Sequence, residues 1–174
     1  SISFKGKGDL KSLSQWEISD EPRRLMGNDL VMAIYVNELI QRLLPEAEEH
    51  SEIFTSYWSY IKNISTLDSV AKEYSLRVFE NQLLQDLGYG LDFDDDINGN
   101  IINNNLQYDY IEDQGFAVND EGVISGSMLL HLSNSNESIT NPNELSILKI
   151  MNRKRLKSLL GDKPLKSKEL FFVD

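Results

Sequence analysis

The chain has 174 residues, a formal net charge of −11 and no cysteine. The lack of cysteine excludes disulfide bonds, thiolate nucleophiles and thiolate metal sites, and it fits a reducing compartment. No apolar run approaches the roughly 20 residues of a membrane span, and the first residues, SISFKGKG, lack the apolar stretch of a secretory signal. We therefore expect a cytoplasmic globular protein with one domain, or with one domain and a fragment.

Residues 1–19 predict a β-hairpin, because residues 1–5 alternate polar and apolar side chains and residues 6–9 are typical of a turn. Two strands alone are marginally stable in water. The hairpin therefore needs partner strands, which the rest of the chain does not obviously supply.

Residues 23–44 predict the first long helix, which Pro45 ends and which Gly27 and Asn28 interrupt near its start. Its expected buried face consists of Met26, Leu30, Ala33, Ile34, Asn37, Leu39, Ile40 and Leu43 or Leu44. Residues 50–63 predict the next helix. Its expected core residues are Ile53, Phe54, Tyr57, Trp58, Tyr60 and Ile61.

Residues 65–90 predict the central helix. Ser65 is the expected N-cap, with Asp68 three residues later, and Gly88 and Gly90 stop the helix. Two separate apolar lines recur at helical spacing between these ends. A helix with two such lines packs on more than one side.

Residues 91–127 are rich in Asp, Asn and Gly and predict a small irregular β unit with strands at 106–111 and 115–118. A short helix over 124–132 and a polar linker over 133–143 follow. The last long helix is expected over 144–160, capped by Asn141 or Asn143 and stopped by Gly161. A short helix over 164–172 ends the chain.

Charge is unevenly distributed along the chain. Residues 86–121 contain ten acidic side chains and no Lys or Arg, whereas residues 149–168 contain eight basic side chains and one acidic one, a net charge of +7. One part of the surface should repel phosphate and another could attract it.

Sequence motifs give little support to an enzyme. His50 and His131 lie far apart in the chain, and the sequence has no G-x-S-x-G turn, no GxGxxG run and no P-loop. We expect a non-enzymatic protein without a cofactor.

One acidic stretch, residues 94–105, matches the start of a calcium-binding loop, with oxygen ligands at alternate positions and Gly99 at the bend. The twelfth position is Asn105 and not the bidentate Glu, and no helix flanks the loop closely. Two interpretations remain: a calcium site, or a tight Asn-rich turn. The second is favoured.

Basic residues near the C-terminus are the candidate DNA-binding residues. They are Arg153, Lys154, Arg155, Lys157, Lys163, Lys166 and Lys168. The alternative is a solvated helix face that balances the acidic β unit.

Arg77 and Phe79 form a second candidate site. An arginine beside apolar side chains suits capture of a carboxylate next to a hydrophobic anchor. The alternative is an arginine that lies over the core with its charge in water.

Three motifs in order resemble the RecO family of bacterial DNA-repair proteins. The first is YVNEL over residues 35–39. The second spans residues 77–90 and contains RVFE, LL and LGYG. The third is GDKPLKSKEL over residues 161–170, with Lys168 where Arg is common. The opening FKGKGDLK over residues 4–11 resembles the last strands of the family's N-terminal OB-fold barrel.

The resemblance implies a fold class and a division of the chain into domains. We expect a mainly α protein: residues 1–20 as the C-terminal remnant of an OB-fold barrel, and residues 21–174 as a helical domain with a small β insertion at 91–127. Many members bind zinc there through four cysteines. The region around Asp96 and Ser125 has none, so no zinc is expected.

The resemblance also implies a function. RecO proteins bind single- and double-stranded DNA, anneal strands and, with RecR, help to load RecA onto strands covered by single-strand-binding protein. The family's helical domain binds the acidic, Phe-ending tail of that protein, and Arg77 matches the helix that makes this contact. We expect a cytoplasmic, nucleoid-associated protein. The barrel carries a main DNA-binding surface and takes part in RecR binding, so those two activities stay open for this chain.

The alternative to a recombination mediator is a truncated, stand-alone helical interaction module without DNA activity. A calcium-binding protein is a third possibility.

Overall fold

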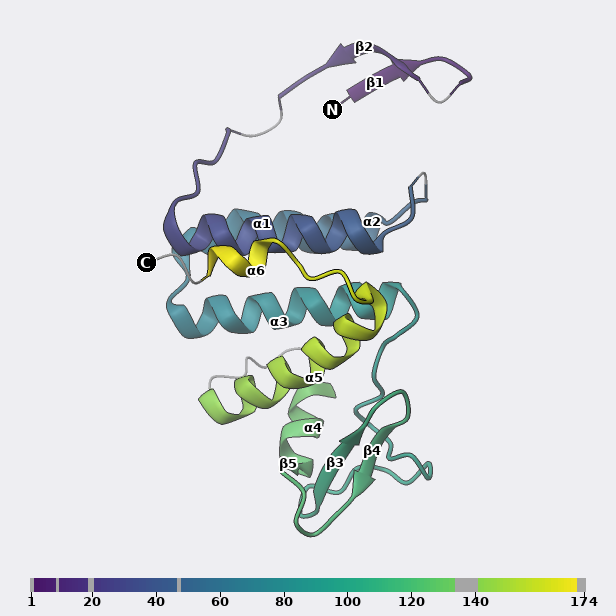
Figure 1. The fold of residues 1–174 in the computed structure, drawn as a ribbon, viewed down its shortest axis with the longest axis vertical. Coiled ribbons are helices and arrows are strands. Elements are labelled where there is room, and N and C mark those ends of the chain that lie inside the picture. The colour runs from purple at the N-terminus through teal and green to yellow at the C-terminus, as the bar shows by residue number, and fades with distance from the viewer. Residues whose placement is uncertain (1, 9, 19–20, 47, 134–140, 172–174) are drawn as a thin grey trace.

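A computed structural model describes residues 2–8, 10–18, 21–46, 48–133 and 141–171. The fold is mainly helical with two small antiparallel sheets, as the sequence predicts. Figure 1 shows a hairpin at one end of the molecule, helices in the middle and a β unit at the other end. Within the described residues, no helix is long and apolar enough to cross a membrane.

The hairpin consists of β1 (Ile2–Lys5) and β2 (Ser12–Trp16). Its register pairs Ile2 with Trp16 and Phe4 with Leu13, so the large apolar side chains share one face. All residues of both strands are exposed, and the hairpin lies apart from the helices in Figure 1. Its apolar face therefore has no packing partner among the described residues.

The middle of the molecule contains α1 (Gly27–Leu43), α2 (Ser51–Asn63), a 3₁₀ turn η1 (Ile64–Thr66) and α3 (Ser69–Asp86). Figure 1 shows α3 between the α1–α2 pair and the later helix α5 (Pro142–Leu160). α3 contacts both α2 and α5. The central position predicted from its two apolar lines is confirmed.

The ends of α3 differ from the prediction at one end only. Asp68 is the N-cap, and its carboxylate accepts a hydrogen bond from the Ala71 amide at 2.9 Å, whereas Ser65 lies in η1. At the other end, Gly88 takes the left-handed conformation with φ of 82°. The amide of Tyr89 donates to the Leu84 carbonyl at 2.8 Å, which completes a Schellman motif.

The β unit is a three-stranded sheet in the order β4–β3–β5, followed by a short helix. Its elements are β3 (Gln107–Ile111), β4 (Gly115–Val118), β5 (Ile124–Ser125) and α4 (Gly126–Ser133). The first two strands agree with the prediction. Ile124 and Ser125 were expected in a helix, but they pair with β3, and α4 begins at Gly126.

α5 and α6 (Ser167–Leu170) form the C-terminal part. Asn141 caps α5 by accepting from the Asn143 amide at 3.0 Å, and Gly161 ends it with φ of 63°. The last helix is shorter than the predicted 164–172. Most of the predicted linker, residues 134–140, and residues 172–174 lie outside the described residues.

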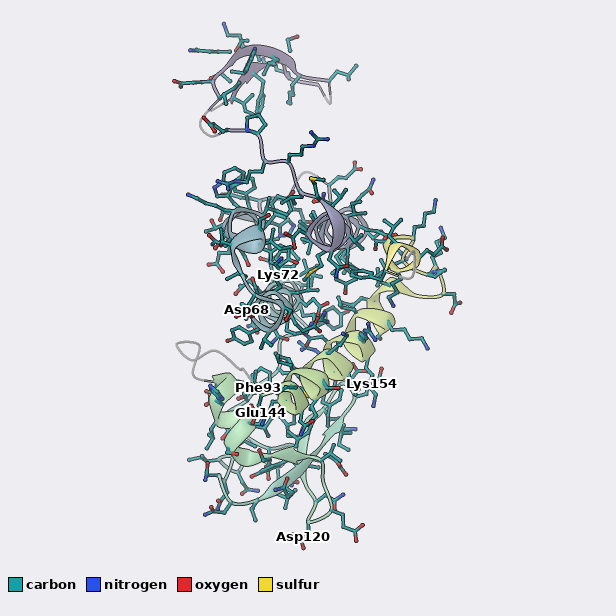
Figure 2. All side chains as sticks on the ribbon, turned by 90° about the vertical axis from the view of Figure 1, so that its left-hand side faces the viewer. Asp68, Lys72, Phe93, Asp120, Glu144 and Lys154 are labelled. Carbon is teal, nitrogen blue, oxygen red and sulfur yellow. The ribbon has the colours of Figure 1, made fainter. Side chains whose placement is uncertain are left out.

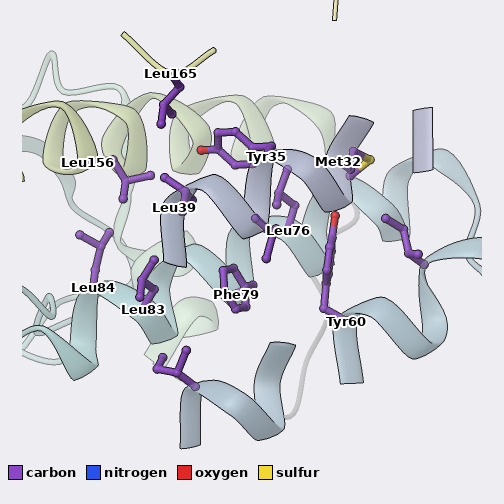
Figure 3. Close-up of a cluster of buried hydrophobic side chains, with 13 residues drawn as sticks. Met32, Tyr35, Leu39, Tyr60, Leu76, Phe79, Leu83, Leu84, Leu156 and Leu165 are labelled. Carbon is purple, nitrogen blue, oxygen red and sulfur yellow. The ribbon is translucent and has the colours of Figure 1, made fainter. Parts of the chain in front are cut away.

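Two hydrophobic cores stabilise the fold. One lies among α1, α2, α3 and the C-terminal part and contains Leu39, Phe79 and Leu156 (Figure 3). The other lies under the β unit and α4 and contains Tyr108 and Phe116. Leu145, Leu148 and Met151 belong to the second core while Leu156 belongs to the first, so α5 joins the two.

Two predicted apolar faces are partly wrong. α1 begins at Gly27 and not at residue 23, and Met26, Leu30 and Ile34 are exposed, while Tyr35 and Val36 are buried. In α2, Phe54 and Trp58 are 66% and 40% exposed. Ile53, Tyr57 and Tyr60 recur at helical spacing toward the core, and Phe54 and Trp58 lie about 100° around the helix from them.

Candidate functional site

A pocket of about 630 Å³ lies where α1, α3, α5 and the C-terminal segment meet; we call it the central pocket. It is lined by Asn28, Met32, Tyr35, Ser69, Lys72, Glu73, Leu76, Arg77, Lys149, Arg153, Lys168 and Phe171. Apolar and aromatic side chains therefore lie beside five cations and one carboxylate. A ligand with an apolar group and negative charge fits this composition.

Carboxylates already neutralise three of the five cations. The Lys72 ammonium lies 2.5 Å from Asp29, and the Lys149 ammonium lies 3.1 Å from Glu73. Arg77 is paired with Glu80 and lies 3.4 Å from Glu73. In the described part of the chain, Arg153 and Lys168 form no ion pair, and both are exposed. They are the cations best placed to accept an incoming anion.

Arg77 is held inside the protein by Glu80. Its Nη1 donates to both carboxylate oxygens of Glu80, at 2.8 and 2.7 Å, and the two residues are 3% and 0% exposed. The Tyr35 hydroxyl also donates to Glu80, at 2.6 Å. Burial and the neighbouring Glu80 charge raise the pKa of Tyr35, so its hydroxyl stays protonated as a donor. Arg77 thus forms part of the pocket wall with its charge largely satisfied.

The same network continues to the far side of α5. Asn152, which is fully buried, donates to Glu80 at 3.0 Å. Arg155 donates to Asn81 at 3.3 Å and to the carbonyl of Tyr89. Burial lowers the pKa of Arg155. Arg155 therefore ties α5 to the end of α3, and it points away from solvent.

A smaller pocket of about 280 Å³ adjoins the central pocket; we call it the C-terminal pocket. Arg153, Lys157, Lys163 and Lys168 supply its cations, and it shares Tyr35, Arg153 and Lys168 with the central pocket. Lys149, Arg153 and Lys157 are spaced four residues apart, so they form one stripe along about 12 Å of α5. The stripe connects the two pockets.

Two residues of α1 hold the segment that carries the C-terminal lysines. The Glu38 carboxylate accepts from the amides of Lys166 and Ser167 at 2.9 and 2.8 Å and from the Ser167 hydroxyl at 2.6 Å. Arg42 donates to the carbonyls of Leu160, Lys163 and Pro164, at 2.8–3.1 Å. Burial opposes ionisation of Glu38, but the hydrogen bonds from Ser167 and Lys166 outweigh it and lower its pKa.

In the loop over residues 94–105, groups of the loop itself donate hydrogen bonds to the Asp96 carboxylate. The Asp96 carboxylate accepts from the backbone amides of Asn98 and Asn100 at 2.8 and 2.9 Å and from the Asn100 side chain. These hydrogen bonds, with the Asn100 amide first, lower the pKa of Asp96. Among the described residues, no group of three or more His, Cys, Asp or Glu side chains is arranged to hold a metal ion. The geometry is that of an Asn-rich turn.

A larger pocket, of about 850 Å³, has a different character. It lies beside the end of α3 and the 88–94 segment and is lined by apolar side chains, amides, Asp92 and Asp94, without any cation. A fourth pocket, between α2 and α3, is lined mainly by hydroxyl side chains. Neither composition suits a phosphate or an acidic peptide.

The predicted site residues fall into two groups. Six of the seven predicted DNA-binding residues are exposed, and Arg155 is buried. Arg77 lines the central pocket, whereas Phe79 lies in the core, 1% exposed, on the side of α3 that faces Tyr60. The roles of these residues in binding stay predictions.

Sequence reasoning missed Met32, Tyr35, Lys72 and Lys149 as pocket residues. One signal was available, because Lys149 precedes Arg153 by four residues on the same helix.

Comparison with known proteins identifies the family. The family described as "Recombination protein O C terminal" matches residues 25–169. A DNA repair protein RecO of Pseudoalteromonas translucida is 36% identical over 170 residues, which is 98% of this chain and 73% of that protein. RecO of Idiomarina loihiensis is 37% identical over 175 residues, covering 97% of this chain and 73% of the relative. RecO of Coxiella burnetii is 36% identical over 176 residues. The chain belongs to the RecO family of DNA repair and recombination proteins.

Proposed function

We propose that this protein is a non-enzymatic recombination mediator that binds DNA and the acidic, Phe-ending tail of single-strand-binding protein. In this role it anneals strands and, with RecR, helps to load RecA. The observation that carries the proposal is the central pocket, in which an apolar floor lies beside two cations without a carboxylate partner among the described residues.

The pocket suits the tail in both of its chemical features. A terminal Phe side chain fits against Met32, Leu76 and Tyr35, all of which line the pocket. The terminal carboxylate and the preceding acidic side chains fit Arg153 and Lys168, because guanidinium and ammonium groups form charge-assisted hydrogen bonds with carboxylates. Arg77, bound to Glu80, forms part of the pocket wall.

The stripe along α5 and the C-terminal lysines supply the DNA surface. Phosphates bind such exposed cations, and the binding weakens with salt as counterions are released. Arg153, Lys154, Lys157, Lys163, Lys166 and Lys168 are the exposed residues of this surface.

Fluorescence anisotropy tests the proposal from the ligand side. A labelled acidic peptide ending in Phe should bind, and peptides with the terminal Phe replaced by Ala, or with an amidated C-terminus, should bind more weakly by about tenfold or more. A labelled oligonucleotide should bind with an affinity that falls steeply with salt.

Peptide binding without salt-dependent DNA binding would favour the alternative of a helical interaction module. Failure of the folded chain to bind either ligand would overturn the proposal. Circular dichroism establishes whether the chain is folded in the same samples.

A further inference from the structure

We infer that the acidic peptide and DNA exclude each other at Arg153 and Lys168, so that the two ligands exchange at one site and do not occupy neighbouring sites. This inference rests on the proposed function and goes beyond it, since two polyanionic ligands could in general bind separate surfaces.

The shared lining of the two pockets is the first observation. Arg153 and Lys168 line both the central pocket and the C-terminal pocket. The central pocket has the apolar floor that a Phe-ending peptide needs, whereas the C-terminal pocket continues into the basic surface formed by Lys157 and Lys163. A peptide carboxylate and a DNA phosphate therefore reach the same two side chains from different directions.

The charge inventory is the second observation. Lys72, Lys149 and Arg77 are already paired with Asp29, Glu73 and Glu80. An anion that recruits one of them must compete with a carboxylate at 2.5–3.1 Å. Arg153 and Lys168 carry no such competitor within the described residues, so both ligands gain most from the same pair.

The attachment of the C-terminal segment is the third observation. Glu38 accepts hydrogen bonds from Lys166 and Ser167, directly before Lys168. Arg153 belongs to α5, which is packed in both cores through neighbouring residues. The backbones that carry the two cations are therefore fixed on the wall that the two pockets share. Two polyanions drawn to the cations of this shared wall repel each other, which disfavours simultaneous binding.

Exclusion at this site gives the mediator an order of events. The peptide tail brings the protein to a covered strand, and exposed DNA then displaces the tail from the shared cations. Since coupling between two ligands is reciprocal, DNA lowers the affinity for peptide by the same factor by which peptide lowers the affinity for DNA.

The test is a pair of competition titrations at constant ionic strength. Unlabelled oligonucleotide should displace the labelled Phe-ending peptide completely. Unlabelled peptide should compete with labelled oligonucleotide for Arg153 and Lys168 and raise the apparent Kd of the oligonucleotide by at least about tenfold. If the peptide stays bound at saturating DNA, the inference is overturned. The proposed function still stands in that case, because each ligand binds alone.

A matched pair of variants tests whether peptide and DNA compete for Arg153. Arg153→Ala should weaken peptide and DNA together, by about tenfold each, since one charge-assisted contact is lost for both ligands. Lys154→Ala removes the next cation on α5 (Figure 2). Lys154 is exposed and lines neither pocket, so this variant should weaken DNA binding and leave peptide affinity unchanged. Loss of DNA affinity alone in Arg153→Ala would also contradict the inference. A folded chain that binds neither ligand would overturn both the inference and the proposed function.

Discussion

The Arg77 guanidinium and the Glu80 carboxylate form an ion pair that is closed to solvent, with one nitrogen of Arg77 within 2.8 Å of both carboxylate oxygens. They are three residues apart on α3, so the helix itself brings them together. Tyr35 and Asn152 donate further hydrogen bonds to the same carboxylate. The pair therefore joins α1, α3 and α5 at the wall of the central pocket.

We expect Arg77→Met to destabilise the protein by about 3–5 kcal/mol, because the substitution leaves a buried carboxylate without its countercharge. Urea unfolding followed by circular dichroism measures this loss. The double variant Arg77→Met with Glu80→Leu should be less destabilised than Arg77→Met alone. If the single substitution costs less than about 1 kcal/mol, solvent or another cation compensates Glu80. If Arg77→Met is destabilised as expected, lost peptide binding in this variant reports unfolding as much as lost contact.

The sequence could not reveal this pair as a buried one. Arg and Glu are usually exposed, and the apolar lines on either side of Arg77 permit both a surface arginine and a buried one. The choice depends on a long-range partner, since Asn152 and Tyr35 lie 72 and 45 residues away from Glu80. Short-range signals worked better: Gly88 and Gly161 end their helices as predicted, because a left-handed cap is a local requirement.

Arg155 is a case in which a local signal was present. It lies three residues after Asn152 and seven after Leu148, which places it on the buried stripe of α5. Its membership of a basic run, residues 153–155, favoured a surface position instead. Helical periodicity was the better guide, because a helix packed on two cores exposes only part of its circumference.

We therefore expect Arg155→Met to lower stability and not to act primarily on DNA. Arg155 donates to the Tyr89 carbonyl and to Asn81, and loss of such charge-assisted hydrogen bonds costs on the order of 2 kcal/mol. Urea unfolding and DNA anisotropy of the same variant separate the two effects.

Lys157→Ala is the comparison for Arg155→Met. Lys157 is exposed and lines the C-terminal pocket, so its loss should weaken DNA binding and change stability by less than about 0.5 kcal/mol. Normal stability with weak DNA binding in Arg155→Met would show that the guanidinium leaves its buried site to reach phosphate.

The attachment of the C-terminal segment to Glu38 should depend on pH. Because the pKa of Glu38 is lowered in the folded state from 4.5, its contribution is present above the unfolded-state pKa and is lost as pH falls through the folded-state pKa. Hydrogen-exchange protection of the Lys166 and Ser167 amides, which bind the carboxylate, should decrease below about pH 4.5. Glu38→Gln should remove this pH dependence. Protection factors that stay constant down to pH 3 in the unsubstituted chain would contradict it.

The N-cap of α3 gives a stability prediction with a control three residues away. The Asp68 carboxylate binds the Ala71 amide, one of the amides without a helical partner in the first turn, and its negative charge lies at the positive end of the helix dipole. Asp68→Ala should therefore lower the free energy of unfolding by about 1 kcal/mol, within a range of about 0.5–2 kcal/mol. Ser65, the N-cap expected from the sequence, lies in η1 before the helix and is exposed, so Ser65→Ala should change stability by less than about 0.5 kcal/mol. Urea unfolding of both variants decides between the two positions: an equal loss, or a larger loss for Ser65→Ala, would move the start of the helix back to the position that the sequence pattern favours.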